Sequence, residues 1–391
     1  MLLTLFIALA VLALIGHGAI WVGLVNRWHS TGYPRKVVKS VTLVFYAGLI
    51  VPLLAAAWYA LSEPWPSPED LHWTLNGATA YIAFCAAYGA AHIPVWAFSR
   101  VRFLRRPDAV QLREHRVVDV AQQLGKSPAR GLRTTIFSRV PANQLWQLHV
   151  SEFSLAIPGL NPQLDGLSIC QWSDLHLSGR IDRGYFREVV RLTNELKVDL
   201  IALTGDICDR AAYIDWLPEI LGPATAALGK YFVLGNHDLR TKKVPQLRAA
   251  MGEAGFTDIG GRWTAIQDRR ILIAGDERPW FKADPLERPL PVDAGGRSLR
   301  ILLSHTPDQI GWARSHGFDL VLAGHTHGGQ IRFPLIGPIL CPSWHGTRYA
   351  GGFFHQPPTL MHVSRGTASL MPLRLNCPPE ITKLVLHRAD S

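Results

Sequence analysis

Cysteine is scarce in this 391-residue chain. The five cysteines are an odd number, and no two of them form a CxxC pair. This pattern excludes a disulfide-based scaffold and a zinc knuckle, and it is typical of a protein in a reducing compartment. The sequence also lacks internal repeats and low-complexity tracts, so it does not indicate a repeat architecture.

Charged side chains are missing from three long stretches near the N-terminus. Residues Met1–Val25, Val41–Leu61 and Trp73–Phe98 are apolar and uncharged. Each stretch is long enough to cross a hydrocarbon core of about 30 Å as a helix. The first stretch has no basic start and further apolar runs follow it, which argues against a cleaved signal peptide. We therefore predict a membrane region with three transmembrane helices over residues 1–99.

The basic residues next to these runs predict their orientation. Lys and Arg follow the first run at 27–39, and six arginines lie at 100–116, whereas the loop at 62–72 has three acids and no base. Because basic loops stay in the cytoplasm, we expect a multi-pass protein of the inner (cytoplasmic) membrane with everything beyond Arg100 inside. Residues 100–150 are then a basic juxtamembrane connector, and residues 151–391 are a catalytic domain facing the cytoplasm.

Most of the net charge of +10 lies in the first part of the chain. Residues 1–150 hold 14 Lys and Arg against 6 Asp and Glu, and residues 151–391 hold 26 against 24. Juxtamembrane basicity suits membrane lipids with anionic headgroups, and a nearly neutral domain offers no nucleic-acid-binding face. We expect no nucleic-acid partner.

From about residue 167 onward, compact apolar runs alternate with segments of helical spacing. Strands are expected in the alternating stretch at 144–157 and in the runs at 167–172, 198–204, 230–234, 270–275, 300–304 and 319–323, with a short return strand at 330–333. Helices are expected at 183–196, 214–228, 244–255 and 307–317. Continuous apolar strands between helices indicate an α/β fold whose sheet is covered on both faces. In such folds, functional groups gather beyond the carboxyl ends of the strands.

Five of the predicted strands end in polar residues of the kind that bind metals. Ser-Asp-Leu-His follows the first, Gly-Asp the second, Gly-Asn-His-Asp the third, a single His the fourth and Gly-His-Thr-His the fifth. The candidate ligands are Asp174, His176, Asp206, Asn236, His305, His325 and His327. Carboxylate, imidazole and amide oxygen donors suit Mn²⁺, Fe or Zn²⁺. Seven ligands exceed the needs of one ion, so we expect two ions that share a carboxylate, hold a hydroxide and clamp phosphate oxygens.

The last of these motifs, AGHTHGGQ at 323–330, places two histidines one residue apart between glycines. In extended backbone, residues two apart face the same way, so we expect His325 and His327 to reach one site. Gly324, Gly328 and Gly329 would let the backbone turn sharply and approach closely.

In this order, the five motifs resemble the signature of the calcineurin-like metallophosphoesterase superfamily, over roughly residues 150–385. The flanking GHTHGGQIRFP and SRGTASLMPLRLNCPPEIT resemble its membrane-associated bacterial branch. The resemblance implies a four-layer α/β/β/α sandwich in place of a single sheet, preceded here by the transmembrane region. It implies that Asp174, His176 and His327 hold one metal, that Asn236, His305 and His325 hold the other, and that Asp206 bridges them. It further implies that His237 is the general acid and that Asp238 orients its imidazole.

The implied function is a membrane-anchored, dinuclear-metal phosphodiesterase or pyrophosphatase, with two divalent ions, Mn²⁺ foremost. A phosphoester substrate borne by a lipid, such as UDP-diacylglucosamine, fits the membrane region. A general phosphomonoesterase, a protein phosphatase and a non-catalytic membrane adaptor that kept the fold remain the alternatives. GDICDR at 205–210 favours the protein phosphatases, but the first and last motifs fit that branch poorly.

Overall fold

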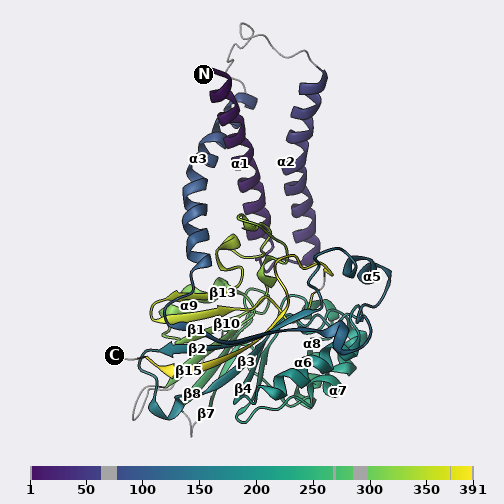
Figure 1. Cartoon of the computed structure of the whole chain (residues 1–391), viewed down its shortest axis with the longest axis vertical. Helices are drawn as coiled ribbons and strands as arrows, with labels where there is room; N and C mark the ends of the chain where they lie inside the picture. Colours follow the sequence, from purple (N-terminus) through teal and green to yellow (C-terminus); the bar gives the residue numbers. More distant parts are fainter. Residues whose placement is uncertain (1, 63–76, 267–269, 285–297, 370, 390–391) are drawn as a thin grey trace. The chain divides into compact units, whose positions relative to one another are not determined.

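The computed structural model describes residues 2–62, 77–266, 270–284, 298–369 and 371–389, and its elements are labelled in Figure 1. The chain divides into two compact units, Met1–Leu104 and Arg105–Ser391. Most of the loop predicted at 62–72, and the start of the third apolar run, lie outside the described residues.

The first unit contains three helices that are long and apolar enough to cross a membrane. They are α1 (Leu2–Trp28), α2 (Arg35–Ser62) and α3 (Gly77–Leu104). Helices α1 and α3 approach closely at two glycines, because a Cβ at Gly16 would lie 1.9 Å from the carbonyl oxygen of Cys85. Small residues at such crossings are typical of packed membrane helices. His17 links all three helices, with its ring nitrogens 2.7 Å from the Tyr81 hydroxyl and 2.9 Å from the Leu49 carbonyl oxygen.

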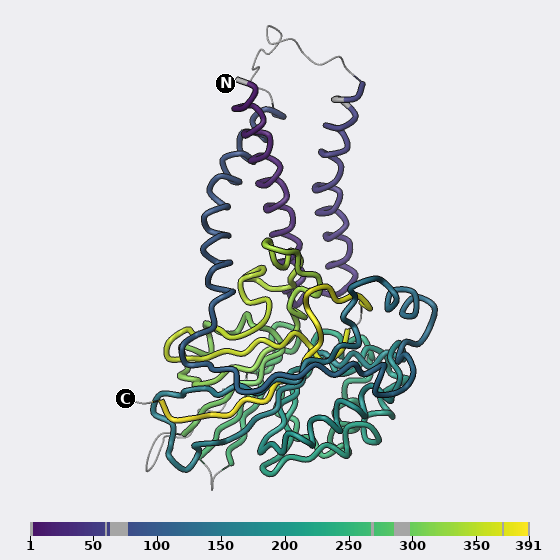
Figure 2. The backbone as a smooth tube through the Cα atoms, viewed as in Figure 1, coloured from purple at the N-terminus to yellow at the C-terminus, as the bar shows by residue number. Residues whose placement is uncertain are grey.

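The second unit contains two large sheets. The seven-stranded sheet runs in the order β1 (Val110–Asp119), β2 (Gln147–Ile157), β15 (Glu380–Arg388), β3 (Ser168–Trp172), β4 (Leu200–Thr204), β5 (Gly229–Val233) and β6 (Phe256–Asp258). The six-stranded sheet runs in the order β13 (Gly352–Gln356), β14 (Thr359–Val363), β10 (Leu320–Ala323), β9 (Leu299–Ser304), β8 (Ile271–Asp276) and β7 (Arg262–Ile266). Figure 2 shows the yellow C-terminal strand lying among the earlier strands of the first sheet.

Successive side chains of a strand point to opposite faces of its sheet, and this alternation divides the core into layers. On β3, Cys170 and Trp172 pack under α6 (Arg183–Glu195), α7 (Leu217–Leu221) and α8 (Val244–Glu253), which lie together on one face in Figure 1. Ile169, one residue along, points instead into the core between the two sheets. Residues of α9 (Ile310–Ser315) cover the outer face of the second sheet. The fold is therefore the four-layer α/β/β/α sandwich, with helices long enough to span a membrane before it.

Local sequence explains where the helices begin and end. The side chain of Asp182 caps α6 by accepting the Gly184 N–H, and the predicted apolar face of that helix is buried. The helix predicted at 214–228 is shorter than expected. Residues Ala211–Trp216 form a 3-10 turn and α7 ends at Leu221, because Gly222 and Pro223 follow it.

Residues 105–150 belong to the second unit, although the sequence suggested a separate connector for residues 100–150. Strand β1 pairs antiparallel with β2 at the edge of the seven-stranded sheet. Two short helices follow it, α4 (Val120–Gln123) and α5 (Leu132–Ser138). The sequence did not predict this strand, because it is rich in arginine and other polar residues. Five of its residues in a row are exposed at the edge of the sheet, where side chains need not be apolar.

The two sheets place five loop tips at a common edge. Strands β3, β4 and β5 are parallel neighbours, as are β9 and β10, so their carboxyl ends lie together within each sheet. The carbonyl oxygen of Ala323, at the end of β10, accepts a hydrogen bond from the side chain of Gln171 on β3, which joins the two sheets near these ends. The polar residues that follow the strands are thereby directed toward one region.

Candidate metal centre

All seven predicted metal ligands converge at this edge of the two sheets. Asp174 and His176 follow β3, Asp206 follows β4, and Asn236 follows β5. His305 follows β9, and His325 and His327 follow β10. Six of the seven fall into two groups whose donor atoms lie within 4.8 Å of one another, and Asn236 borders the second group.

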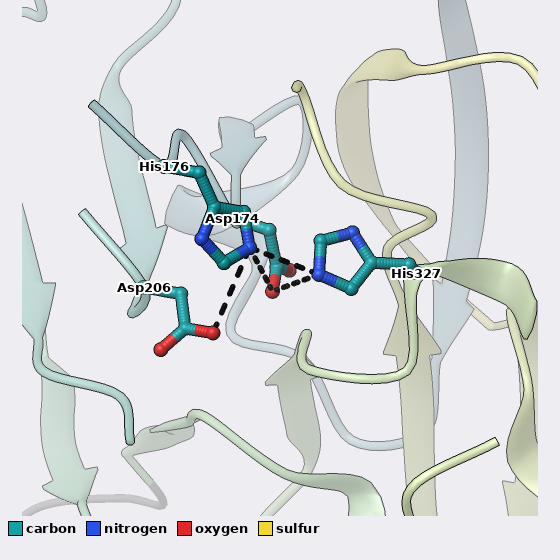
Figure 3. A group of neighbouring side chains, drawn as sticks. All are labelled: Asp174, His176, Asp206 and His327. Atoms are coloured by element: carbon teal, nitrogen blue, oxygen red, sulfur yellow. Dashed lines mark hydrogen bonds and ion pairs between the residues drawn. The ribbon is translucent and has the colours of Figure 1, made fainter. Parts of the chain in front are cut away.

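The first group consists of Asp174, His176, Asp206 and His327 (Figure 3). Nε2 of His176 lies 3.0 Å from Nε2 of His327. Oδ1 of Asp174 lies 3.2 Å from the same His327 nitrogen, and Oδ2 of Asp206 lies 3.7 Å from His176 Nε2. Asp174, His176 and Asp206 are almost completely buried, so water cannot solvate their charges.

The second group consists of Asp206, His305 and His325, with Asn236 beside them. Nε2 of His305 faces Oδ1 of Asp206 at 3.3 Å, Oδ1 of Asn236 at 3.2 Å and Nδ1 of His325 at 3.1 Å. Asp206 is common to both groups, and it turns Oδ2 toward the first and Oδ1 toward the second. A carboxylate placed in this way can share two cations.

Hydrogen bonding at the far side of two rings, those of His305 and His176, leaves their Nε2 atoms facing inward. Nδ1 of His305 donates to the carbonyl oxygen of Thr204 at 2.8 Å, so its Nε2 carries the lone pair when the ring is neutral. Nδ1 of His176 lies 3.2 Å from Oδ2 of Asp209 in the same manner. Oδ1 of Asp174 is buried and accepts no hydrogen bond. Acceptors that crowd together without donors fit a pair of bound cations.

The electrostatics of the group also favour positive charge. Burial disfavours protonated imidazole, but the carboxylates of Asp209, Asp206 and Asp174 outweigh it and raise the pKa of His176 to about 9. His305 is likewise buried, and Asp206 and Asp174 raise its pKa to about 9. Burial opposes ionisation of Asp206, yet the His305 and His237 imidazoles hold its pKa well below the usual range. The site thus attracts protons where it lacks a metal ion.

The backbone is strained at the predicted ligands. Positive φ angles occur at five of these seven residues, namely Asp174 (55°), His176 (49°), Asp206 (53°), His325 (70°) and His327 (50°). Such conformations cost about 1–3 kcal/mol each and persist where the surrounding structure imposes them, often at functional sites. His325 and His327 therefore do not use extended backbone as predicted. A turn with left-handed φ at both residues turns one imidazole toward each group.

Two glycines permit the close approach of these loops. A Cβ at Gly235 would lie 2.3 Å from Oδ1 of Asp206, and a Cβ at Gly324 would lie 1.8 Å from Oγ of Ser173. The Cβ at Gly324 would also lie 2.7 Å from Oδ2 of Asp174, so a side chain at either position would displace a predicted metal ligand. The expectation that glycine next to His325 permits a close approach is confirmed for Gly324.

Comparisons with known proteins agree with this geometry. A model of the calcineurin-like phosphoesterase family matches residues 167–329. An uncharacterized metallophosphoesterase of Bacillus subtilis, YkuE, is 33% identical over 236 residues, which cover 58% of this chain and 81% of that protein. Phosphodiesterase YaeI of Escherichia coli is 32% identical over 220 residues, 55% of this chain and 80% of that protein.

The chain belongs to the calcineurin-like phosphoesterase family. It is accordingly a metal-dependent phosphoester hydrolase. A Bos taurus relative, named a transmembrane protein with metallophosphoesterase domain, is 30% identical over 298 residues. This match covers 70% of the present chain and 65% of the relative.

The predicted general acid of this phosphoesterase, His237, has a different partner from the one expected. Its Nδ1 contacts Oδ1 of Asp209 at 2.5 Å. Asp238 does not orient the imidazole, because its carboxylate accepts the backbone N–H groups of Ile207, Cys208 and Gly235. Asp238 is therefore a clamp between the loops after β4 and β5, and its predicted role is corrected. Burial lowers the pKa of His237 to about 4, although Asp206 and Asp209 favour its charged form.

Sequence reasoning missed three residues that border the phosphoesterase site. Asp209 contacts both His176 and His237, and its position three residues after Asp206 was the available signal. Trp280 lies in the loop after β8 with its ring centroid 5.3 Å from that of His305 and 4.8 Å from that of His325. Arg374 is fully buried and donates to the carbonyl oxygens of Ala368, at 2.6 Å, and His327, at 3.3 Å. No local pattern marks Trp280, whereas Arg374 lies within the segment at 364–382 that resembles the membrane-associated branch.

We predict that metal binding by the phosphoesterase depends on pH. His176 and His305, with pKa values of about 9, hold protons in the metal-free protein at lower pH and must release them to become ligands. The Mn²⁺ affinity should therefore rise with pH up to about 9, with proton release on binding. Calorimetry in buffers of different ionisation enthalpy measures both quantities. An affinity that stays constant between neutral pH and about pH 9 would contradict this assignment.

A second prediction separates binding from proton transfer. His237→Ala should lower turnover by about 10²–10⁴-fold, the usual contribution of a positioned acid–base group, while metal content stays unchanged. Asp206→Asn should lose both activity and metal, because each metal group loses a negatively charged oxygen. Metal content by inductively coupled plasma mass spectrometry, beside initial rates, distinguishes the two variants. Equal metal loss in both would place His237 among the ligands.

Proposed function

We propose that the protein hydrolyses a phosphodiester or pyrophosphate bond with two divalent cations, Mn²⁺ foremost. The observation that supports this most strongly is Asp206, which turns one carboxylate oxygen toward each ligand group. Asp174, His176 and His327 would hold one cation, and Asn236, His305 and His325 the other. When bound, the cations neutralise phosphate charge and lower the pKa of a bound water toward about 7.

The surrounding residues orient the site and move protons. Asp209 holds the rings of His176 and His237, so one carboxylate couples a metal ligand to the proposed acid. Because Asp209 accepts the Nδ1 proton, His237 donates through Nε2 only when the ring is protonated. Burial lowers the pKa of His237, whereas Asp206 and Asp209 favour the protonated ring, and an anionic substrate would favour it further. His237 then protonates the departing oxygen.

The substrate we propose is carried by a lipid. Three helices of membrane-spanning length in the same chain support this idea, because they would hold the catalytic unit beside lipid. A relative bears the name phosphodiesterase, which supports hydrolysis of a diester. A pyrophosphate-linked sugar lipid such as UDP-diacylglucosamine is one candidate.

The purified full-length protein in detergent with Mn²⁺ should release product from bis-p-nitrophenyl phosphate and from UDP-diacylglucosamine faster than from p-nitrophenyl phosphate. The reason is that the proposed reaction cleaves a P–O bond at a phosphorus that carries two ester or anhydride oxygens, whereas p-nitrophenyl phosphate carries only one. The His237→Ala protein provides the matched control. Preference for p-nitrophenyl phosphate would favour a general phosphomonoesterase, and metal-bound protein without any activity would favour the adaptor.

We also propose that the protein is a multi-pass protein of the inner membrane with its catalytic unit in the cytoplasm. Arginines at 100–116 support this orientation. A C-terminal green fluorescent protein should therefore fluoresce in a bacterial host, and a C-terminal alkaline phosphatase should stay inactive. Active alkaline phosphatase fused after Ser391 would reverse the orientation.

A further inference from the structure

An apolar segment follows the metal-binding loop directly. Residues 331–344 include the small hairpin of β11 (Arg332–Phe333) and β12 (Gly337–Pro338), and they begin four residues after the ligand His327. Large apolar side chains along the segment are exposed, from Leu335, at 88%, and Trp344, at 60%, to Phe333, at 46%. The backbone N–H of Ile331 donates to Gly329, and Nε of Arg332 donates to Gly328 at 2.7 Å, so the segment is anchored to the metal-binding loop.

Two further segments that carry exposed apolar side chains are joined to this one, and the second of them contributes Met371. Helix α5 and the residues after it expose Leu132, Ile136 and Val140. Asn143 ties that region to the chain near Met371, because its side chain donates to the carbonyl oxygen of Pro372 at 2.9 Å. Figure 1 shows α5 beside this yellow segment.

The same yellow segment also reaches the hairpin. The N–H of Arg332 donates to Leu375 at 2.9 Å, and the side chain of Asn376 donates to the carbonyl oxygen of Arg332 at 2.9 Å. We call the three connected segments, 331–344, 371–376 and 131–143, the apolar rim.

Exposed apolar side chains of the catalytic unit are concentrated on the apolar rim. Among the described residues from Arg105 onward, thirteen large hydrophobic side chains are exposed, and ten of them lie on the rim. The exceptions are Leu112, Val117 and Leu239. A surface of this kind marks an interaction site when it is contiguous and bordered by polar residues.

The charge of the rim is of one sign. No Asp or Glu occurs between residues 120 and 151 or between residues 320 and 379. Lys126, Arg130, Arg133 and Arg139 are exposed next to or within the α5 part of the rim. Apolar side chains among exposed arginines, without carboxylates, are typical of segments that lie in the headgroup region of an anionic bilayer.

We propose that the apolar rim docks on the anionic surface of the bilayer, inserts its hairpin at the boundary between headgroups and acyl chains, and so presents the metal centre to phosphoesters in that surface. The chain itself supports this partner. Only residues 105–109 separate α3 from β1, a reach of at most about 18 Å, so a membrane that holds α3 keeps this unit near lipid. A second copy of the chain fits poorly, because two basic rims repel each other.

Insertion can be tested without any substrate. The five native cysteines are buried, so Leu335→Cys in the full-length protein offers one exposed thiol for the fluorophore NBD. In nanodiscs of phosphatidylglycerol and brominated phosphatidylcholine, the label should be quenched by lipid and shielded from iodide. Glu253→Cys, exposed at the end of α8, is the matched control and should behave oppositely. Labelled wild-type protein gives the background.

A pair of substrates with the same leaving group tests the consequence for catalysis, and this arm rests on the proposed function. Phosphatidyl-p-nitrophenol is embedded in the nanodisc, whereas bis-p-nitrophenyl phosphate is dissolved in water. Leu335→Asp should lower the rate on the embedded substrate roughly tenfold, because a charged side chain no longer enters the interface, and should leave the soluble substrate unchanged. Val117→Asp, also at an exposed apolar residue but outside the rim, should change neither rate.

The labelling and activity experiments distinguish a failure of the docking proposal from a failure of the proposed function. Wild-type protein that cleaves neither p-nitrophenyl ester contradicts the proposed function, while quenching of the Leu335→Cys label would still support docking. Iodide quenching of that label equal to the Glu253→Cys control overturns the docking proposal. So does efficient disulfide cross-linking of Leu335→Cys between two copies, which would identify the rim as a contact between protomers.

Discussion

The structure of the catalytic unit depends on hydrogen-bond acceptor atoms that lie unusually close together at the candidate metal site. Two imidazole nitrogens lie 3.0 Å apart, and a buried carboxylate oxygen of Asp174 lies 3.2 Å from one of them without a hydrogen bond. This arrangement is unfavourable unless a cation lies among the donors. Protons can take that place in the metal-free protein, as the raised pKa values of His176 and His305 indicate. Divalent cations would balance the same negative charges, and each cation would bind several of these donor atoms at once.

The rest of the fold keeps these groups from relaxing apart. Asp238 accepts three backbone N–H groups from the loops after β4 and β5, and Arg374 binds the turn of His327 to the C-terminal segment. Glycines at 235 and 324 let the loops approach closely, and left-handed backbone at five of the predicted ligands orients their side chains. These hydrogen bonds and the packed sheets behind the site thus maintain its strained backbone conformation.

The apolar rim makes the surface beside the candidate metal site different from the rest of the catalytic unit. It begins at the metal-binding loop and carries exposed apolar and basic residues, whereas β15 and the helices α6–α8 contribute buried apolar residues to the core on the other layers. A catalytic edge with such a border suits a substrate that sits in a surface. The same loop therefore links the chemistry of His325 and His327 to the proposed docking on lipid.

The sequence by itself determined the class of the fold and the residue types that lie together at the candidate metal site. Asp, Asn and His directly after apolar strands are local patterns, and the parallel strands of each sheet bring such residues to one edge whatever the loops between them do. The three long apolar runs were equally legible, because length and composition alone decide whether a helix can span a bilayer.

Tertiary structure decided what depends on contacts between distant residues. Asp209 replaced Asp238 as the partner of His237 because the loop after β4 folds over that ring, and both acids look alike in the sequence. The polar strand β1 joined the sheet through backbone pairing, to which its side chains give no clue. The rim arose because hydrogen bonds connect the region after α5, the hairpin and the segment at 371–376, where the bonded residues Asn143 and Pro372 are 229 positions apart in the chain. Such proximity is a property of the folded chain, and no local pattern encodes it.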